Sequence, residues 1–142
     1  FNGANVTVLG ATIDGDVLVT DGSVIGLSDA TINGDLFVFD GSELQVSAGG
    51  GVGTTIHGDV VVDRAVAVSI LDFLATTTIG GDVVVSRSST LTFALVEIFG
   101  DVALLGNDCS DAFVFEATVY GNLICKFNTP DNSICDQFTV VE

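Results

Sequence analysis

The sequence predicts an all-β fold, a right-handed parallel β-helix (β-solenoid) of about six three-stranded coils. The first observation is a motif, Ile-x-Gly-Asp-(Val/Leu)-x-Val, that returns in six versions along the 142 residues. The second is its spacing, because successive motif glycines lie 19 to 24 residues apart. Short β-branched runs separated by Gly-Asp corners at such a period are typical of a solenoid, and its hand follows the rule for parallel crossovers. The motif glycines are Gly15, Gly34, Gly58, Gly81, Gly100 and Gly121.

Each coil is expected to contain three short strands whose inward residues form columns through the stack. Apolar residues two apart share one face of a strand, so these columns are the predicted core. The first strand contributes the residue before the corner: Ile13, Ile32, Ile56, Ile79, Ile98 and Val119. The second contributes the pairs Val17/Val19, Leu36/Val38, Val60/Val62, Val83/Val85, Val102/Leu104 and Leu123/Cys125. The third contributes Ile25/Leu27, Leu44/Val46, Val66/Val68, Leu91/Phe93 and Phe113/Phe115, with Val6/Val8 in a partial first coil.

The corners between strands contain both the motif glycines and the insertions that vary the length of the repeat. The motif glycine permits a sharp corner that a Cβ atom would obstruct. Extra residues fall at 48–53, a glycine-rich bulge, at 70–75, and at 106–111, which contains Cys109. The middle insertion brings large apolar side chains to a corner, where they either fold back over the coil or contact a partner. These side chains are Ile70, Leu71, Phe73 and Leu74.

Length and charge restrict the classes of partner. Residues 1–142 are expected to form a single β-helix domain, with residues 125–142 as a C-terminal tail that ends in a strand-like run. No apolar run approaches the roughly 18 residues of a membrane span. A net charge of −16, from 19 acidic and three basic residues, repels nucleic acid and anionic lipid. The chain lacks methionine and begins at Phe1, which predicts removal of a signal segment and an extracellular or cell-surface location.

Few residues in the sequence are candidates for covalent modification, catalysis or metal binding. Cys109, Cys125 and Cys135 lie in the last third, and in an exported protein they predict one intramolecular disulfide and one odd thiol. Asn5 begins an Asn-Val-Thr sequon, a candidate glycosylation site. The single histidine, His57, has no nucleophile or metal-ligand companion in the sequence, and no Cys/His spacing suggests zinc. An enzyme is therefore not expected.

A column of carboxylates is predicted at the corner after each motif glycine. Carboxylates stacked about 5 Å apart repel one another unless something neutralises them. Either each accepts hydrogen bonds from backbone N–H groups of the turn, or calcium lies between neighbouring side chains. The nonapeptide of calcium-binding solenoids is absent, so no cofactor is expected and calcium is the alternative. The residues are Asp16, Asp35, Asp59, Asp82 and Asp101, followed by Asn122.

A column of threonines precedes the motif: Thr12, Thr31, Thr55, Thr78 and Thr118, interrupted by Glu97. Solenoid ice-binding proteins present two such columns as one flat surface. The companion column here is mixed: Asp14, Asn33, His57, Gly80, Phe99 and Tyr120. The preference of β-branched residues for strands is the simpler explanation of the threonines.

The outward face of the second strand is apolar where a polar residue is expected. A strand that is apolar on both faces is normally covered on both sides, and soluble monomers rarely leave so long a surface open. We expect another subunit to cover it, with the chain's own tail as the alternative. The predicted assembly interface consists of Leu18, Phe37, Phe39, Val61, Val84, Leu105 and Ile124, with Ala103 in the same column.

The repeated unit resembles that of secreted bacterial β-helix repeat proteins, whose last coils contain a Gly-Asn-Leu-x-Cys-x-x-Asn-x-Pro segment and a later cysteine. Residues 121–130 read Gly-Asn-Leu-Ile-Cys-Lys-Phe-Asn-Thr-Pro, and Cys135 follows. The resemblance implies export, a β-helix and a Cys125–Cys135 bond, with Cys109 unpaired or intermolecular, and it assigns no activity. A looser similarity is to bactofilins, which are cytoskeletal β-helices that polymerise.

Three classes of function fit these features. The first is a structural subunit that self-assembles into an extracellular fibre, filament or surface array through coil ends and the apolar outer face. No amphipathic capping helix is evident at either end, and open edges recruit further strands. The second is a cell-surface binding or adhesin module with a surface or matrix partner. The third is a solenoid that binds ice or calcium.

Overall fold

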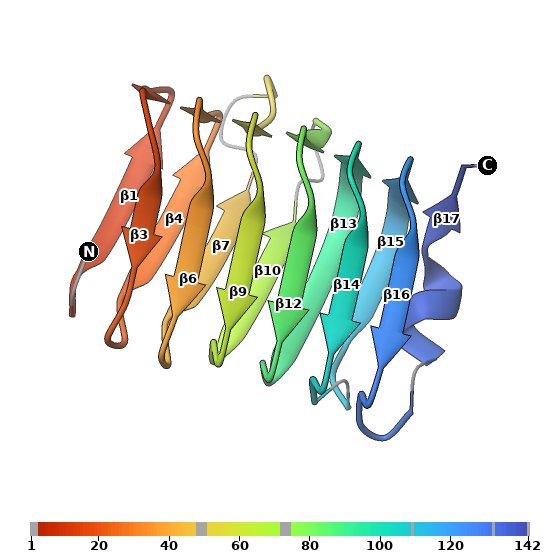
Figure 1. The fold of residues 1–142 in the computed structure, drawn as a ribbon. Coiled ribbons are helices and arrows are strands. Elements are labelled where there is room, and N and C mark those ends of the chain that lie inside the picture. The colour runs from red at the N-terminus through yellow and green to blue at the C-terminus, as the bar shows by residue number, and fades with distance from the viewer. Residues whose placement is uncertain (1–2, 48–50, 72–74, 109, 132, 142) are drawn as a thin grey trace.

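The computed structural model describes residues 3–47, 51–71, 75–108, 110–131 and 133–141. They form a parallel β-solenoid of about six turns, which confirms the predicted fold class. Figure 1 shows the coils as a row of similar loops that stack from the N-terminal to the C-terminal end. Among the described residues, no helix is long and apolar enough to cross a membrane.

Each coil contains the three strand positions that the sequence predicts. Because the described chain begins within a partial coil, the strands occur along it in the order third, first, second. The third-position strands are β1 (Asn5–Leu9), β4 (Val24–Ser28), β7 (Glu43–Ser47) and β10 (Ala67–Leu71). The first-position strands are β2 (Thr12–Ile13), β5 (Thr31–Ile32), β8 (Thr55–Ile56), β11 (Thr77–Ile79) and β17 (Thr139–Val140). The second-position strands are β3 (Val17–Val19), β6 (Leu36–Phe39), β9 (Val60–Asp63), β12 (Val83–Ser86), β14 (Val102–Leu105) and β16 (Leu123–Lys126). Two longer strands, β13 (Thr90–Ile98) and β15 (Phe113–Val119), combine the third and first positions.

These strands build two parallel sheets. The six-stranded sheet contains the second-position strands in the order β16-β14-β12-β9-β6-β3. The eleven-stranded sheet runs β1-β4-β7-β10-β13-β11-β8-β5-β2, with β15 paired to β13 and β17 paired to β15. Each strand pairs in register with its equivalent one coil away, as Ile32 does with Ile13 and Ile56. Equivalent side chains are therefore stacked directly on one another.

The predicted inward columns form the core in the middle of the stack. Ile56, Val62, Ile79 and Val85 are fully buried, and Val60 is 1% exposed. At these positions each side chain packs against an aliphatic residue in the coils above and below, as the close packing of protein interiors requires. The predicted first-position and second-position columns are thus correct along most of the chain.

Two of the predicted third-strand pairs are wrong. In the fourth coil the inward pair is Val68/Ile70, and Val66 is 50% exposed beside the corner. Ile70 is therefore a core residue within β10 and not part of a flap. Leu71 is the last residue of that strand. The predicted insertion residues Phe73 and Leu74 lie outside the described residues.

The second wrong pair is Phe113/Phe115, which points outward. Val114 lies over the buried Phe93 instead. The insertion at 106–111 changes which face of the following strand is inward, and the period-two pattern of Phe-Val-Phe fits both faces. Their rings lie parallel on the outer surface, with centroids 6.5 Å apart.

The C-terminal tail also differs from the expected open strand. It contains a 3₁₀ helix, η1 (Ser133–Gln137), before β17. Ile134 and Phe138 of this tail are 2% and 8% exposed, and Phe138 packs edge-on against Phe93 with ring centroids 5.4 Å apart. This short 3₁₀ helix, which was not expected from the sequence, therefore covers part of the last coil. Figure 1 shows η1 and β17 as the last layer of the stack.

The disulfide implied by the family resemblance, Cys125–Cys135, is present, with the Cα atoms 6.4 Å apart. It joins the last second-position strand, β16, to η1. Cys109 lies outside the described residues. The bond fixes the tail against the last full coil.

Candidate assembly surfaces

The outward residues at the middle of the strands in the six-stranded sheet form one continuous column. Strand pairing places each of them beside the next in register. We call this set the apolar outer column: Leu18, Phe37, Val61, Val84, Ala103 and Ile124. Leu18 is 50% exposed and Ile124 is 41% exposed, while the members between them are half-buried by their stacked neighbours. The structure thus brings together five of the seven predicted interface residues.

The other two predicted interface residues, Phe39 and Leu105, occupy a parallel column that is polar in the middle. Asp63 and Ser86 separate them in register. Phe39 nevertheless extends the apolar surface, because its ring lies 6.2 Å from that of Phe37. Leu105 lies beside Lys126 at the other end. The apolar surface is therefore widest near the N-terminal end.

A charged cluster lies at the corner beside this surface. Arg87 donates to both carboxylate oxygens of Asp63, at 2.9 and 2.6 Å, and Arg64 donates to Asp40 of the preceding coil. Ser86 also donates to Asp63, at 2.6 Å. Burial raises the pKa of Asp63, but the hydrogen bonds from Ser86 and Arg87 outweigh it and hold the pKa below its usual value. Two of the three basic residues therefore neutralise carboxylates within the stack.

The aspartate column is satisfied by the backbone of the next coil. The Oδ1 atom of Asp16 accepts the N–H of Asp35 at 2.9 Å, and Asp35 accepts the N–H of Asp59 at 2.8 Å. The same contact recurs in the following coils, at 2.7 to 2.8 Å: Asp59 accepts the N–H of Asp82, Asp82 that of Asp101, and Asp101 that of Asn122. The donor comes from the following coil and not from the same turn, which sequence reasoning did not distinguish. The N–H and then the side-chain amide of Asn122 lower the pKa of Asp101.

The same contact explains the motif glycine. A Cβ atom on Gly58 would lie 2.1 Å from the Asp35 Oδ1 and 2.6 Å from the Gly34 carbonyl oxygen. The aspartate side chain crosses this space to reach the next N–H, so only glycine fits beneath it. Glycine and aspartate in the motif are thus two halves of one inter-coil contact. Among the described residues, no group of three or more His, Cys, Asp or Glu side chains is placed to hold a metal ion.

The threonine column extends into the tail, because Thr139 pairs with Thr118. Glu97 interrupts it between Thr78 and Thr118, as expected. Its companion column contains Phe99 and Tyr120, whose rings stack with centroids 4.8 Å apart, and it is not flat. A shallow hollow of about 360 Å³ lies beside the column and includes the side chains of Glu97 and Glu116.

The N-terminal end of the stack presents three strand edges. β1 and β2 stand at the two ends of the eleven-stranded sheet, and β3 stands at one end of the six-stranded sheet. Val6, Val8 and Ile13 are only half-buried there, because no coil lies beyond them in the part of the chain that the structure describes. Asn5, the candidate glycosylation site, is exposed on β1. The described residues at this end thus form the last strand of each sheet beside a partly exposed core.

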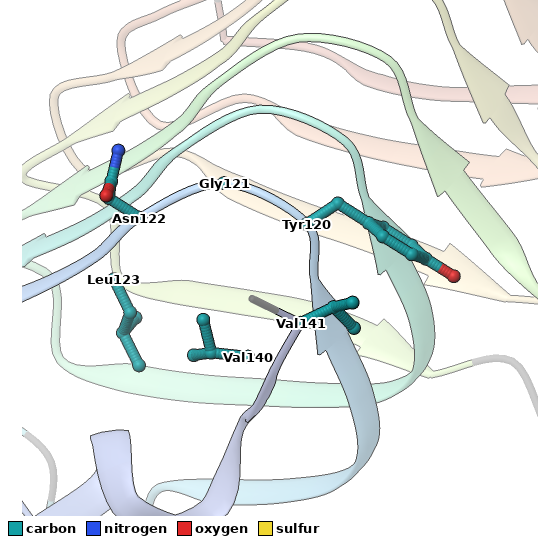
Figure 2. Close-up of a pocket in the computed structure, with 6 residues that line it drawn as sticks. All are labelled: Tyr120, Gly121, Asn122, Leu123, Val140 and Val141. Atoms are coloured by element: carbon teal, nitrogen blue, oxygen red, sulfur yellow. The ribbon is translucent and has the colours of Figure 1, made fainter.

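The C-terminal end is only half covered. β17 stacks on β15, and the Val141 N–H donates to the Val119 carbonyl at 2.9 Å. No described strand follows β16 in the other sheet. A hollow of about 610 Å³ remains there, and Figure 2 shows the corner at Gly121 and Asn122 passing above Leu123 and Val140. The hollow lies over the corner between β15 and β16, beside the end of β17.

Sequence reasoning missed a buried polar column at the corner after the second strand. The Asn107 Nδ2 donates to the Val85 carbonyl at 2.9 Å, and its N–H donates to the Asn128 Oδ1 at 2.9 Å. Asn128 in turn donates to the Leu104 carbonyl at 3.0 Å. The signal was available, because Asn107 and Asn128 are separated by the same 21 residues as Gly100 and Gly121. Serines take the equivalent place in earlier coils, at Ser23, Ser42 and Ser88.

Comparisons with protein families, curated protein sequences and solved structures yield no match for this chain. The function is therefore inferred from the fold and its surfaces.

Proposed function

We propose that the protein is a non-enzymatic structural subunit of an extracellular fibre, filament or surface array. Copies associate through the ends of the coil stack and through the apolar outer column. The observation that carries the proposal is the position of the tail: η1 and β17 pack on β15, in the other sheet, and within the described part of the tail no segment packs on the apolar outer column. Soluble proteins rarely expose a continuous apolar surface unless it is an interaction site.

The edges of the sheets support the same proposal. An exposed parallel strand presents a row of unpaired N–H and C=O groups, which recruits another strand. Among the described residues, β1 and β2 end the eleven-stranded sheet, and β16 ends the six-stranded sheet at the C-terminal side. Arg64 and Arg87, which lie at the corner beside the apolar surface, are paired internally with Asp40 and Asp63.

Extracellular location is part of this proposal. The Cys125–Cys135 disulfide supports it, because such bonds persist in oxidising compartments. The acidic surface also keeps single subunits apart at low salt. Charges farther apart than a Debye length of about 10 Å at 0.1 M salt are screened, so added salt should promote association.

The test compares two single substitutions that change the charge equally. Phe37→Lys places a cation in the apolar outer column, and Gln45→Lys places one on the exposed face of β7, in the other sheet. Light scattering after size exclusion and negative-stain microscopy, at increasing salt, should show assemblies of the wild type and of Gln45→Lys. Phe37→Lys should assemble at least about tenfold more weakly, since burying an unpaired charge is costly. A wild-type protein that stays monomeric at high concentration and moderate salt would disprove the proposed function.

A further inference from the structure

We propose that the apolar outer column pairs with the same column of a second copy, in a two-fold symmetric dimer whose coil stacks run antiparallel. The two-fold axis lies between β9 and β12 and is parallel to the strands of the six-stranded sheet. In this arrangement β9 faces β12 of the second copy, β6 faces β14, and β3 faces β16. This inference rests on the proposed function and specifies how the apolar outer column is used.

Side-chain size along the apolar outer column is complementary when the second copy is reversed. Phe37 on β6 is the largest member of the column and Ala103 on β14 is the smallest, and each lies one strand beyond the central pair. Reversal places each Phe37 ring over the Ala103 of the other copy, while Val61 faces Val84 between them. In a parallel pair Phe37 would meet Phe37 and Ala103 would meet Ala103, which leaves a clash and a void in one contact.

The neighbouring outward column agrees with the same arrangement. It lies two residues further along each strand, and from β6 to β14 it reads Phe39, Asp63, Ser86 and Leu105. Because the axis is parallel to the strands, this column faces its own reversed copy. Phe39 then faces Leu105, and Asp63 faces Ser86, the residue type that already donates to it within the chain at 2.6 Å. Apolar positions therefore meet apolar ones, and polar positions meet polar ones.

Sliding the second copy by one coil in either direction loses this agreement. With the axis through β9, the Asp63 carboxylates of the two copies would face each other and Phe39 would face Ser86. With the axis through β12, Asp63 would lie against Leu105 and Phe39 against Lys126. Each shift also leaves an end strand of the sheet without a strand opposite. The axis between β9 and β12 pairs all six described strands of the sheet.

Electrostatics make this contact dependent on salt. Burying Asp63 costs little, because its side chain is already only 17% exposed and both its oxygens accept hydrogen bonds from Arg87 of the same chain. The corner aspartates, however, line the same margin of the contact in both copies, with Asp59 opposite Asp82, and they repel each other. Salt screens such exposed charges beyond about 10 Å at 0.1 M, so the dimer should form as salt is added.

Symmetry and size limit what this contact can build. A two-fold contact closes on itself, so it joins two copies and no more. Five strand spacings of roughly 4.8 Å give the face a length of about 24 Å. This is small beside the interfaces of permanent dimers. The lateral species should therefore be a dimer that dissociates on dilution.

Short crosslinks measure the orientation of the two copies. Asp21 and Phe127 are exposed corner residues that follow β3 and β16, at opposite ends of the stack. Within one chain they are five coils apart, roughly 24 Å, too far for a short bismaleimide. In the antiparallel dimer each of them lies over the other in the second copy. Asp21→Cys and Phe127→Cys are prepared as separate proteins, both with Cys109→Ser, and are treated alone and mixed at dimer-promoting salt.

A crosslinked dimer in the mixture, with little from either protein alone, is the expected result. A crosslink that forms as readily with one protein alone would overturn the antiparallel orientation. Salt-dependent assembly without a crosslink in the mixture would overturn it as well, yet would leave the proposed function standing. A wild type that stays monomeric would instead refute the proposed function and this inference together.

Exchanging the large and small side chains gives a second, independent measurement. Ala103→Phe adds apolar area, so non-specific adhesion would strengthen, whereas the proposed dimer should weaken by about tenfold because two rings meet. Phe37→Ala should weaken it similarly by leaving a void. The double variant Phe37→Ala/Ala103→Phe again sets each ring over an alanine and should recover to within about threefold of the wild type. Sedimentation equilibrium gives the dissociation constants, and circular dichroism during heating confirms folding. Stronger association of Ala103→Phe, or no recovery in the folded double variant, would overturn the proposed pairing.

Discussion

At the N-terminal end of this molecule β1, β2 and β3 are the outermost described strands of the two sheets, whereas at the C-terminal end η1 and β17 cover half of the last coil. The two ends are made from the same repeat. Gly15 shows the contrast, because a Cβ atom there would meet nothing within 4 Å, while one at Gly121 would lie 2.4 Å from the Gly100 carbonyl oxygen. Gly15 instead has a φ of 115°, which itself favours glycine. The motif glycine is thus required for backbone conformation at the end of the stack and for lack of space inside it.

The surfaces near the two ends differ in composition. Five aromatic side chains are exposed after residue 98: Phe99, Phe113, Phe115, Tyr120 and Phe127. Among the described residues before that point, the exposed large apolar residues are aliphatic: Leu9, Leu18, Val52 and Val66. The comparison teaches that repeat symmetry fixes the interior, while the solvent face of each coil is free to differ.

The largest expected effect contrasts the middle of the stack with its N-terminal end. Val60→Asp should prevent folding, because an unpaired buried carboxylate costs more than about 5 kcal/mol, comparable with the stability of a whole domain. Val6→Asp, at a half-buried position on the edge strand, should lower the melting temperature and leave the protein folded. Circular dichroism during heating measures both. Equal loss of structure in the two variants would show that the end is as tightly packed as the middle.

A smaller effect compares the two ends directly. Phe138→Ala removes the ring that packs on Phe93 and should reduce the free energy of unfolding by about 3 kcal/mol. Leu9→Ala, at a residue that is 67% exposed on β1, should change it by less than about 0.5 kcal/mol. Urea denaturation of the monomer at low salt gives both values. A similar cost at the two positions would mean that the tail contributes no more to stability than the open end does.

The smallest effect concerns the end of the aspartate column. Asn122→Asp removes the side-chain amide that donates to Asp101 at 2.9 Å and adds a carboxylate one coil away. The pKa of Asp101 in the folded protein lies below 3.8, so its stabilising contribution is present above pH 3.8 and is lost as the pH falls through the lowered value. The variant should therefore unfold at a lower urea concentration than the wild type at pH 7. The difference should disappear well below pH 3.8, and a difference of equal size at both pH values would point to packing instead.

Much of the fold followed from the sequence because in-register stacking repeats the same physical requirements in every coil. The first-position and second-position columns, the Gly-Asp corner and the outward apolar column were all predicted from spacing. One regularity was overlooked. The first inward residue of the third strand lies ten residues after the motif glycine at Ile25, Leu44, Val68 and Leu91, which would have corrected the Val66/Val68 pair.

The orientation of Phe113 and Phe115 and the packing of the tail were decided only in three dimensions. An alternating run fits either face of a strand, and the length of a corner determines which face turns inward. Residues 133–138 have no counterpart in the repeat, so no column indicated that Ile134 and Phe138 are buried. Their burial depends on the exposed end of the last coil and on the Cys125–Cys135 bond. The sequence by itself determined the features that every coil shares. The tertiary structure decided how the stack ends, because the residues at an end do not pack against an equivalent coil and so do not follow the repeat pattern.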